Sequence, residues 1–220
     1  MTNRALVVVD LQEDFLPPNG SLAIPDGRSI VQPIIELVTG TNLSQWSLVV
    51  ATQDWHPANH TSFASQHGVE PLAELEFRHP NTGEIKKQYV WPDHCVQGSA
   101  GAKLESNFAK AFAEIKGVPT VNVKKGYLQD REYYSCFQDT WGLHQTEMKR
   151  TLVEHAIDEV VFVGLAFDYC VLNSAIDSAD SFKTYVVESL SKSVTPENDS
   201  KTKEIYKSSG VSVVKEISDI

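Results

Sequence analysis

The feature of this chain that most constrains its fold is a series of short apolar runs rich in β-branched residues. Segments with helical periodicity separate these runs, and this alternation is typical of strands and helices that build a parallel sheet. The apolar residues are consecutive rather than alternating with polar ones, as expected for strands that helices cover on both faces. The predicted strands are residues 5–10, 47–52, 120–125, 159–164 and 184–189, with an edge strand at 210–215.

Four segments between the runs carry apolar residues at three- and four-residue spacing, which predicts helices. They are residues 30–38, 102–115, 146–155 and 169–182. The stretch from Gln66 to Gln88 shows no clean period, and we expect a surface excursion there. The 220 residues contain no internal repeat, low-complexity tract or linker. The chain is therefore predicted to be a single α/β domain over residues 1–220.

Charge and cysteine content exclude several classes of protein. Nineteen basic against 29 acidic side chains give a formal net charge of -10, which would repel phosphate backbones and anionic headgroups. We therefore expect neither nucleic acid nor membrane partners. Three cysteines are too few for a disulfide framework and favour a reducing compartment.

The residues at the two ends of the sequence favour an intracellular location. No secretion signal precedes the first apolar run, and the C-terminal "SDI" is not a Ser-Lys-Leu address. We expect an intracellular protein of the cytoplasm or nucleus, which would enter a peroxisome only by indirect import on a partner. The oligomeric state stays open, with a homo-oligomer allowed, because sequence alone reveals no interface patch.

Three residues with reactive side chains lie where predicted strands end, at the edge of an α/β sheet that binds ligands. Asp10 ends the first run, and Lys125 ends "TVNVKK". Cys170 follows "VVFVG" at the start of a predicted helix with Asp168 as its N-cap, where the positive end of the helix dipole favours a thiolate. Each residue also has a purely structural interpretation: a capping aspartate, a solvated lysine and a small buried side chain.

Strand alternation separates Lys125 from its neighbour Lys124. Val121, Val123 and Lys125 point to one side of an extended chain, and Lys124 points to the other. If the valines pack inward, Lys125 is the lysine that reaches the end of the sheet. Two solvated lysines at a strand exit remain the alternative.

A second group of residues has the composition of a metal site. Asp54 and His56 in "TQDWHP" are two residues apart and lie on the same side of an extended chain, and "WPDHC" adds His94. Two histidines and one carboxylate suit zinc, iron or manganese without choosing among them. Cys95 is interpreted as buried packing, because adjacent residues rarely reach the same ion. The same spacing also fits two turns with structural histidines.

These fragments occur together and in order, which is far more specific than any one of them. Through "ALVVVDLQEDF", "ATQDWHPANHTSF", "WPDHCVQG", "KKGYLQDREYYSCF" and "VGLAFDYCV" the chain resembles the isochorismatase-like cysteine hydrolase family, above all its fungal nicotinamidases. The resemblance covers nearly the whole chain and implies a three-layer α/β/α sandwich with a mostly parallel central sheet. It implies Cys170 as nucleophile, Asp10 as acid/base and Lys125 as the third catalytic residue, with Asp54, His56 and His94 holding a divalent metal, expected to be Zn²⁺.

The implied activity is hydrolysis of nicotinamide to nicotinate and ammonia through a cysteine thioester, within NAD salvage. The metal would hold the pyridine nitrogen. The N–H groups of Cys170 and Ala166 would bind the oxyanion, with a cis peptide between Leu165 and Ala166. Fungal relatives commonly carry an acidic residue where this chain has Lys124. The expected pocket residues are Phe15, Trp91, Tyr133 and Leu165.

Two alternatives to a nicotinamidase stay open. A metal-free carbamoyl-amide hydrolase, or another amide hydrolase of this fold, would share the three catalytic residues without needing the three metal ligands. The vinyl-ether hydrolases of the family lack the nucleophilic cysteine, so "FDYC" argues against them. A non-catalytic binding module would have no reason to retain all six residues.

Overall fold

A six-stranded parallel sheet forms the centre of the computed structural model, which describes residues 2–220. The strands are β1 (Arg4–Val9), β2 (Leu48–Asp54), β5 (Thr120–Lys125), β6 (Glu159–Leu165), β7 (Lys183–Lys192) and β8 (Ser212–Val214). Their order is β5-β2-β1-β6-β7-β8, and every neighbouring pair is parallel. All six predicted strands are present, so the predicted parallel sheet is confirmed.

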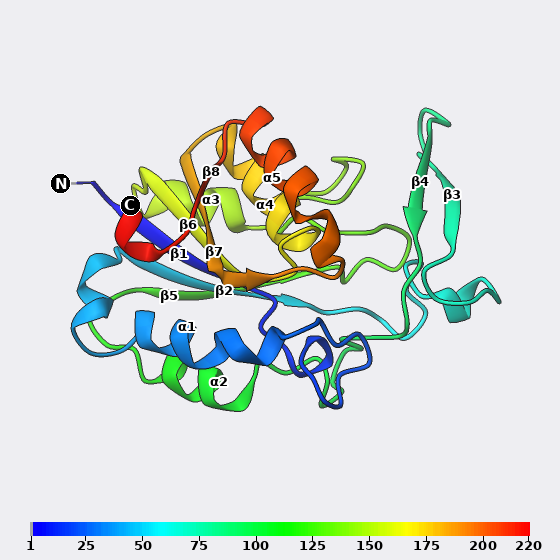
Figure 1. Cartoon of the computed structure of the whole chain (residues 1–220). Coiled ribbons are helices and arrows are strands. Elements are labelled where there is room, and N and C mark those ends of the chain that lie inside the picture. Colours follow the sequence, from blue (N-terminus) through cyan, green and yellow to red (C-terminus); the bar gives the residue numbers. More distant parts are fainter. Residues whose placement is uncertain (1) are drawn as a thin grey trace.

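Helices cover both faces of this sheet. Figure 1 shows α1 (Val31–Leu37) and α2 (Ser106–Ala113) on one face, and α3 (Met148–Glu154), α4 (Cys170–Ala179) and α5 (Asp199–Ser208) on the other. The first four fall inside the predicted helical segments but are shorter than predicted. The three-layer α/β/α fold class is therefore confirmed. No helix among residues 2–220 has both the length and the apolar character needed to cross a membrane.

The central strands are buried on both faces because their side chains alternate between two apolar cores. Leu6 and Val8 of β1 pack in the core shared with α1 and α2, and Val7 and Val9 pack in the core shared with α4. All four are fully buried. Each such side chain contributes about 1.5–3 kcal/mol of transfer free energy. The continuous apolar runs of the sequence follow from this two-sided burial.

Three elements of the structure were not predicted. The region of the predicted excursion, residues 66–88, overlaps an antiparallel hairpin of β3 (Glu74–Arg78) and β4 (Ile85–Tyr89), which stands apart from the main sheet in Figure 1. Its strands "ELEFR" and "IKKQY" are too polar to be recognised by apolar runs. Helix α5 was not predicted either, because only Thr202 and Tyr206 of its ten residues are buried.

Parallel strands place their carboxyl ends along one edge of the sheet. Strands β1, β2, β5 and β6 are neighbours in the order β5-β2-β1-β6, so the residues that follow them meet at this edge. The predicted reactive residues Asp10, Asp54, Lys125 and Cys170 all lie at or just beyond these strand ends. The fold therefore brings together residues that are far apart in the sequence.

Candidate active site

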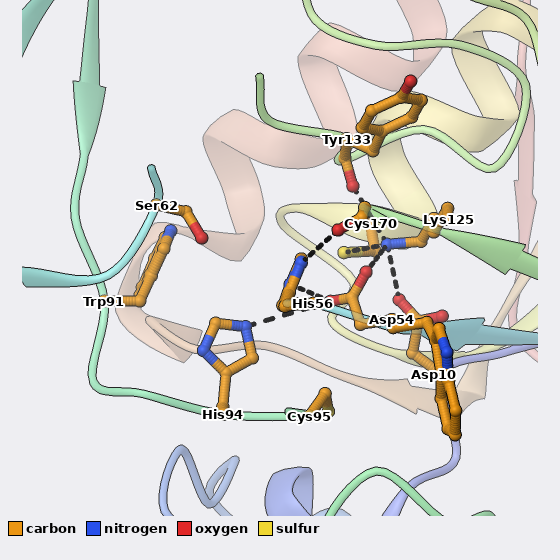
Figure 2. Close-up of polar contacts among 12 residues, drawn as sticks. Asp10, Asp54, His56, Ser62, Trp91, His94, Cys95, Lys125, Tyr133 and Cys170 are labelled. Carbon is orange, nitrogen blue, oxygen red and sulfur yellow. Dashed lines mark hydrogen bonds and ion pairs between the residues drawn. The ribbon is translucent and has the colours of Figure 1, made fainter. Parts of the chain in front are cut away.

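The amino group of Lys125 is the centre of a buried polar cluster. Its Nζ lies 2.6 Å from Oδ1 of Asp54, 2.9 Å from Oδ2 of Asp10 and 3.3 Å from Sγ of Cys170, and it donates a hydrogen bond of 3.0 Å to the carbonyl of Tyr133 (Figure 2). Lys125 and Asp10 are both completely buried. One ammonium group thus contacts two carboxylates and a thiol away from water.

Strand register explains why Lys125 occupies this position. Lys125 pairs with Asp54 in the parallel ladder between β5 and β2, so their side chains leave the sheet side by side. Val123 is buried on the same side of β5, as strand alternation predicts. Lys124 points the other way, and its Nζ lies 3.7 Å from the ring centroid of Trp55. The structure therefore brings Lys125, and not Lys124, into the cluster.

Asp10 follows β1 with a left-handed backbone, at φ 47°. Aspartate tolerates this region better than most residues that carry a Cβ. The hydroxyl of Thr52 accepts a hydrogen bond from the Asp10 N–H at 3.1 Å and donates one to Oδ1 at 2.6 Å, which leaves Oδ2 facing Lys125. Burial raises the pKa of Asp10, and the nearby Lys125 opposes this shift. A carboxylate of raised pKa is suited to accept a proton.

Cys170 is the first residue of α4, so its N–H has no acceptor within the helix. The predicted N-cap role of Asp168 is wrong, because its carboxylate accepts hydrogen bonds from the N–H groups of Val194 and Thr195 instead. Burial raises the pKa of the Cys170 thiol well above 9.0, and Lys125 opposes this shift only in part. The helix dipole does not by itself give a resting thiolate, so the thiol needs a base.

The charges in the cluster stabilise one another. Burial would lower the pKa of Lys125, but Asp10 and Asp54 raise it well above 10.5. Burial would likewise raise the pKa of Asp54, but Lys125 and His56 lower it on balance. Buried charges persist only when they are paired in this way. Lys125 and Asp54 are therefore charged, and carboxylate oxygens of Asp10 and Asp54 lie within 4.8 Å of Sγ of Cys170.

The three predicted metal ligands form a second group next to this cluster. One donor atom each from Asp54, His56 and His94 lie within 4.8 Å of one another, and all three side chains are buried. Nδ1 of His56 hydrogen-bonds to the carbonyl of Gly126 at 2.8 Å, and Nδ1 of His94 to that of Pro92 at 2.7 Å. A carbonyl only accepts, so both Nδ1 atoms carry the proton and both Nε2 atoms are free to bind a metal.

The donor set fits a divalent cation. Nε2 of His56 is buried, has no hydrogen-bond partner among residues 2–220 and lies 3.5 Å from Oδ2 of Asp54. Burial would lower the pKa of His56, but Asp54 raises it on balance, whereas burial and His56 lower the pKa of His94 to about 4. The site thus favours a positive charge, but its two imidazoles do not both become protonated. A bound metal ion would supply the positive charge instead.

His60 lies against this group without joining it. Its ring stacks on His56 with centroids 4.1 Å apart, and its two nitrogens hydrogen-bond to the hydroxyl of Ser62 and the carbonyl of Arg131. Burial and the neighbouring His56 lower its pKa to about 3. Both nitrogens have protein partners, so His60 has no free donor for a metal. Cys95 is fully buried, as predicted.

A cavity of about 390 Å³, counting its open mouth, adjoins both groups. Asp54, His94 and Cys170 line it, as do the predicted pocket residues Phe15 and Trp91. Its remaining lining residues are Leu22, Ile24, Glu132, Tyr134, Ala166, Tyr169 and Val194. The reactive groups therefore share one small chamber with aromatic and aliphatic walls.

The structure does not bring Tyr133 and Leu165 to the cavity wall. The hydroxyl of Tyr133 lies 2.8 Å from Nδ1 of His144, and its ring points away from the site in Figure 2. Leu165 is buried at the end of β6, and the predicted cis peptide to Ala166 is present. Ala166 lines the cavity.

The sequence interpretation missed Tyr134 and Tyr169 as wall residues. The indole N–H of Trp91 points at the hydroxyl of Tyr134 at 3.3 Å, and its ring meets that of Tyr169 edge-on with centroids 4.9 Å apart. Tyr134 was one residue away from the predicted Tyr133 in "DREYYS". Residues 132–134 form neither helix nor strand, so no periodicity distinguishes the two tyrosines.

Comparison with known proteins identifies the family. Residues 4–216 match the isochorismatase domain. The chain belongs to the isochorismatase family. Within this family, it is 38% identical over 220 residues to the nicotinamidase of Saccharomyces cerevisiae, covering 96% of this chain and 99% of the relative.

Solved structures of isochorismatase-family proteins have the same fold. The crystal structure of yeast nicotinamidase bound to the inhibitor nicotinaldehyde aligns with a TM-score of 0.90 at 36% identity, covering 97% of this chain and 100% of that one. The pyrazinamidase of Pyrococcus horikoshii in complex with zinc aligns with a TM-score of 0.72 at 29% identity, covering 97% and 99%. The resemblance inferred from the sequence motifs is therefore confirmed.

Proposed function

We propose that this chain is a nicotinamidase, which hydrolyses nicotinamide to nicotinate and ammonia. The observation that carries the proposal is the position of Cys170, which lines the cavity with its Sγ 3.3 Å from Nζ of Lys125. The similarity to yeast nicotinamidase over nearly the full length of both chains supports the choice of substrate. Nicotinate is a precursor of NAD, so the reaction belongs to NAD salvage.

The first half of the proposed reaction acylates Cys170. Asp10 removes the thiol proton, and the sulfur attacks the amide carbon to form a carbon–sulfur bond and a tetrahedral oxyanion. The N–H of Cys170, which has no acceptor within α4, and the N–H of Ala166 are the proposed oxyanion donors. Asp10 returns the proton to the amine as the carbon–nitrogen bond breaks, and ammonia leaves.

The second half releases nicotinate. Asp10, again a carboxylate, removes a proton from water, and the hydroxide attacks the thioester carbon. The carbon–sulfur bond then breaks, and Asp10 gives its proton to the departing thiolate of Cys170, which restores the thiol. Lys125 contacts Asp10 and Cys170 throughout, so its positive charge offsets the negative charge that moves between them.

Asp54, His56 and His94 are the proposed ligands of a divalent metal, with zinc the expected ion because the related Pyrococcus protein was crystallised with it. When bound, the ion supplies a Lewis acid that can hold the pyridine nitrogen of the substrate. Phe15 and Trp91 of the cavity wall would confine the ring, so that its carboxamide faces Cys170.

Ammonia release from nicotinamide tests the proposal. The purified protein is assayed as isolated, after removal of metal by a chelator, and after addition of zinc, with Cys170→Ala as the control for contaminating amidase. We expect release that falls on chelation, returns with zinc and is absent in the variant. No release from protein with a full complement of metal would overturn the proposal and point to another amide substrate.

A further inference from the structure

A buried glutamine holds the main chain of Asp54. Gln12 is completely buried, and its carboxamide makes three hydrogen bonds. Nε2 donates to the carbonyls of Asp54 and Ala102, each at 2.8 Å, and Oε1 accepts from the N–H of Asp54 at 2.8 Å. One side chain thus satisfies both peptide groups of a proposed metal ligand.

The position of Gln12 follows from an early end of β1. The main-chain pairing of β1 with β2 ends at Val8 and Ala51, and the chain turns away at Asp10. Strand β2 continues to Asp54, whose N–H and C=O therefore have no peptide group of β1 beside them. The carboxamide of Gln12 supplies one donor and one acceptor, as a peptide group would.

Asp54 is held from its other side as well. It pairs with Lys125 in the ladder of β2 and β5, and the N–H of the next residue, Trp55, donates to the carbonyl of Lys125 at 2.9 Å. The main chain at Asp54 is therefore fixed between a strand and a side chain. An aspartate has only two side-chain torsions, so a fixed main chain leaves its carboxylate little freedom.

The carboxylate of Asp54 joins the two halves of the site. Oδ1 lies 2.6 Å from Nζ of Lys125, and Oδ2 lies 3.5 Å from Nε2 of His56. A shift of Asp54 would consequently disturb both the lysine beside the nucleophile and the donors proposed for the metal.

We propose that Gln12 is a positioning residue for this reaction, which orients Asp54 for the metal and for Lys125. The inference rests on the proposed function, but its first consequence is a metal affinity that can be measured without substrate. Groups that orient metal ligands typically contribute 10- to 100-fold to metal affinity or activity.

Gln53 provides a matched control. It is also buried, and its Nε2 donates to the same carbonyl of Ala102 at 2.8 Å. Its Oε1 accepts from the amide of Asn122, and none of its side-chain bonds reaches the peptide groups of Asp54. Gln12→Met and Gln53→Met therefore both remove a buried amide of the same length, but only the first releases Asp54.

The experiment measures zinc affinity of the full-length protein by competition with a coloured chelator, together with thermal melting and nicotinamide kinetics. Gln12→Met should bind zinc roughly 10- to 100-fold more weakly than wild type. Its kcat/KM should also fall at saturating zinc, because Lys125 loses its fixed partner. Gln53→Met should melt at a similarly lowered temperature with wild-type zinc affinity.

Gln12→Glu is the second variant, which keeps an acceptor for the Asp54 N–H but replaces the donor to the Asp54 carbonyl. It should also weaken zinc binding, and it tests the inference if Gln12→Met does not fold. Zinc affinity within about threefold of wild type in folded Gln12 variants, or an equal loss in Gln53→Met, would overturn the positioning role. A wild-type protein that binds zinc but releases no ammonia would overturn the nicotinamidase proposal instead and leave the zinc comparison intact.

Discussion

The amino group of Lys125 lies 3.3 Å from the sulfur of Cys170, although the two residues are 45 positions apart. Lys125 ends the edge strand β5, and Cys170 begins α4 after β6. Strands β2 and β1 lie between β5 and β6, so the contact spans the carboxyl end of the sheet. Asp10 and Asp54 come from these two intervening strands and neutralise the lysine.

Replacing the thiol separates catalysis from metal binding. Cys170→Ala should abolish ammonia release and leave the zinc stoichiometry unchanged, because the proposed ligands are Asp54, His56 and His94. Ammonia release from nicotinamide measures the activity. Elemental analysis of the same samples measures the bound zinc. Turnover that survives in the variant would exclude a covalent mechanism.

The two adjacent lysines should differ greatly in their contribution. Lys125→Met leaves two buried carboxylates without a counter-charge, so we expect loss of activity and a fall of about 3–5 kcal/mol in the free energy of unfolding. Lys124→Met loses only the contact with Trp55, which is worth about 1 kcal/mol or less at an exposed site. Denaturant unfolding and turnover of both variants check this. Greater damage from Lys124→Met would contradict the assignment.

Gly126 leaves room for the imidazole of His56. A Cβ at this position would clash with Cε1 and Nδ1 of that ring, so Gly126→Ala should displace His56 and weaken zinc binding by roughly tenfold or more. Gly117 has a similar positive φ, and no atom of the described part of the chain lies within 4 Å of its Cβ position, so Gly117→Ala is a control for backbone strain alone. Chelator competition compares the two variants. Equal zinc affinity in both would show that the close approach to His56 is unimportant.

The acidic limb of the pH profile of kcat/KM should reflect the ionisation of Asp10. A general base must be ionised, and burial raises the pKa of Asp10 above 3.8, so kcat/KM should fall as the pH decreases through that raised pKa. The hydrogen bond from Thr52 lowers the pKa of Asp10, so Thr52→Val should move the limb to higher pH. Bound zinc is measured at each pH, because protonation of His56 and His94 also releases metal. A limb that stays in place or moves to lower pH in Thr52→Val would argue against Asp10 as the base.

Much of the fold was predictable because its strands are buried on both faces. Consecutive valines and leucines, as in β1, β2 and β6, are typical of strands in the middle of a parallel sheet. The β3–β4 hairpin and α5 were not predictable in this way, since few of their side chains are buried and their sequences are mostly polar. Runs and regular spacings of apolar residues reveal a strand or helix only when enough of its side chains are buried.

The site was predictable to the extent that strand ends and alternation determine it. Asp10, Asp54 and Lys125 follow from these two rules and the motif resemblance. The choice of Tyr134 over Tyr133 depends on the path of a loop that has no period. Gln12 was missed for a related reason. A side chain that hydrogen-bonds to the main chain of another segment does not change the spacing of apolar residues along the sequence. Contacts of this kind are recognised only in the three-dimensional structure, where the two segments lie side by side.

The strand order also determines when the sheet can form during synthesis on the ribosome. Strand β1 is made first but lies between β2 and β6, and Arg4 pairs with Glu159, 155 positions later. At about 5–20 residues per second, roughly 8 to 30 seconds separate the synthesis of these two residues. Throughout that interval the growing chain has no Cys170 and cannot close the middle of its sheet. A nascent chain that ends before Cys170 therefore has no nucleophile to place beside Lys125.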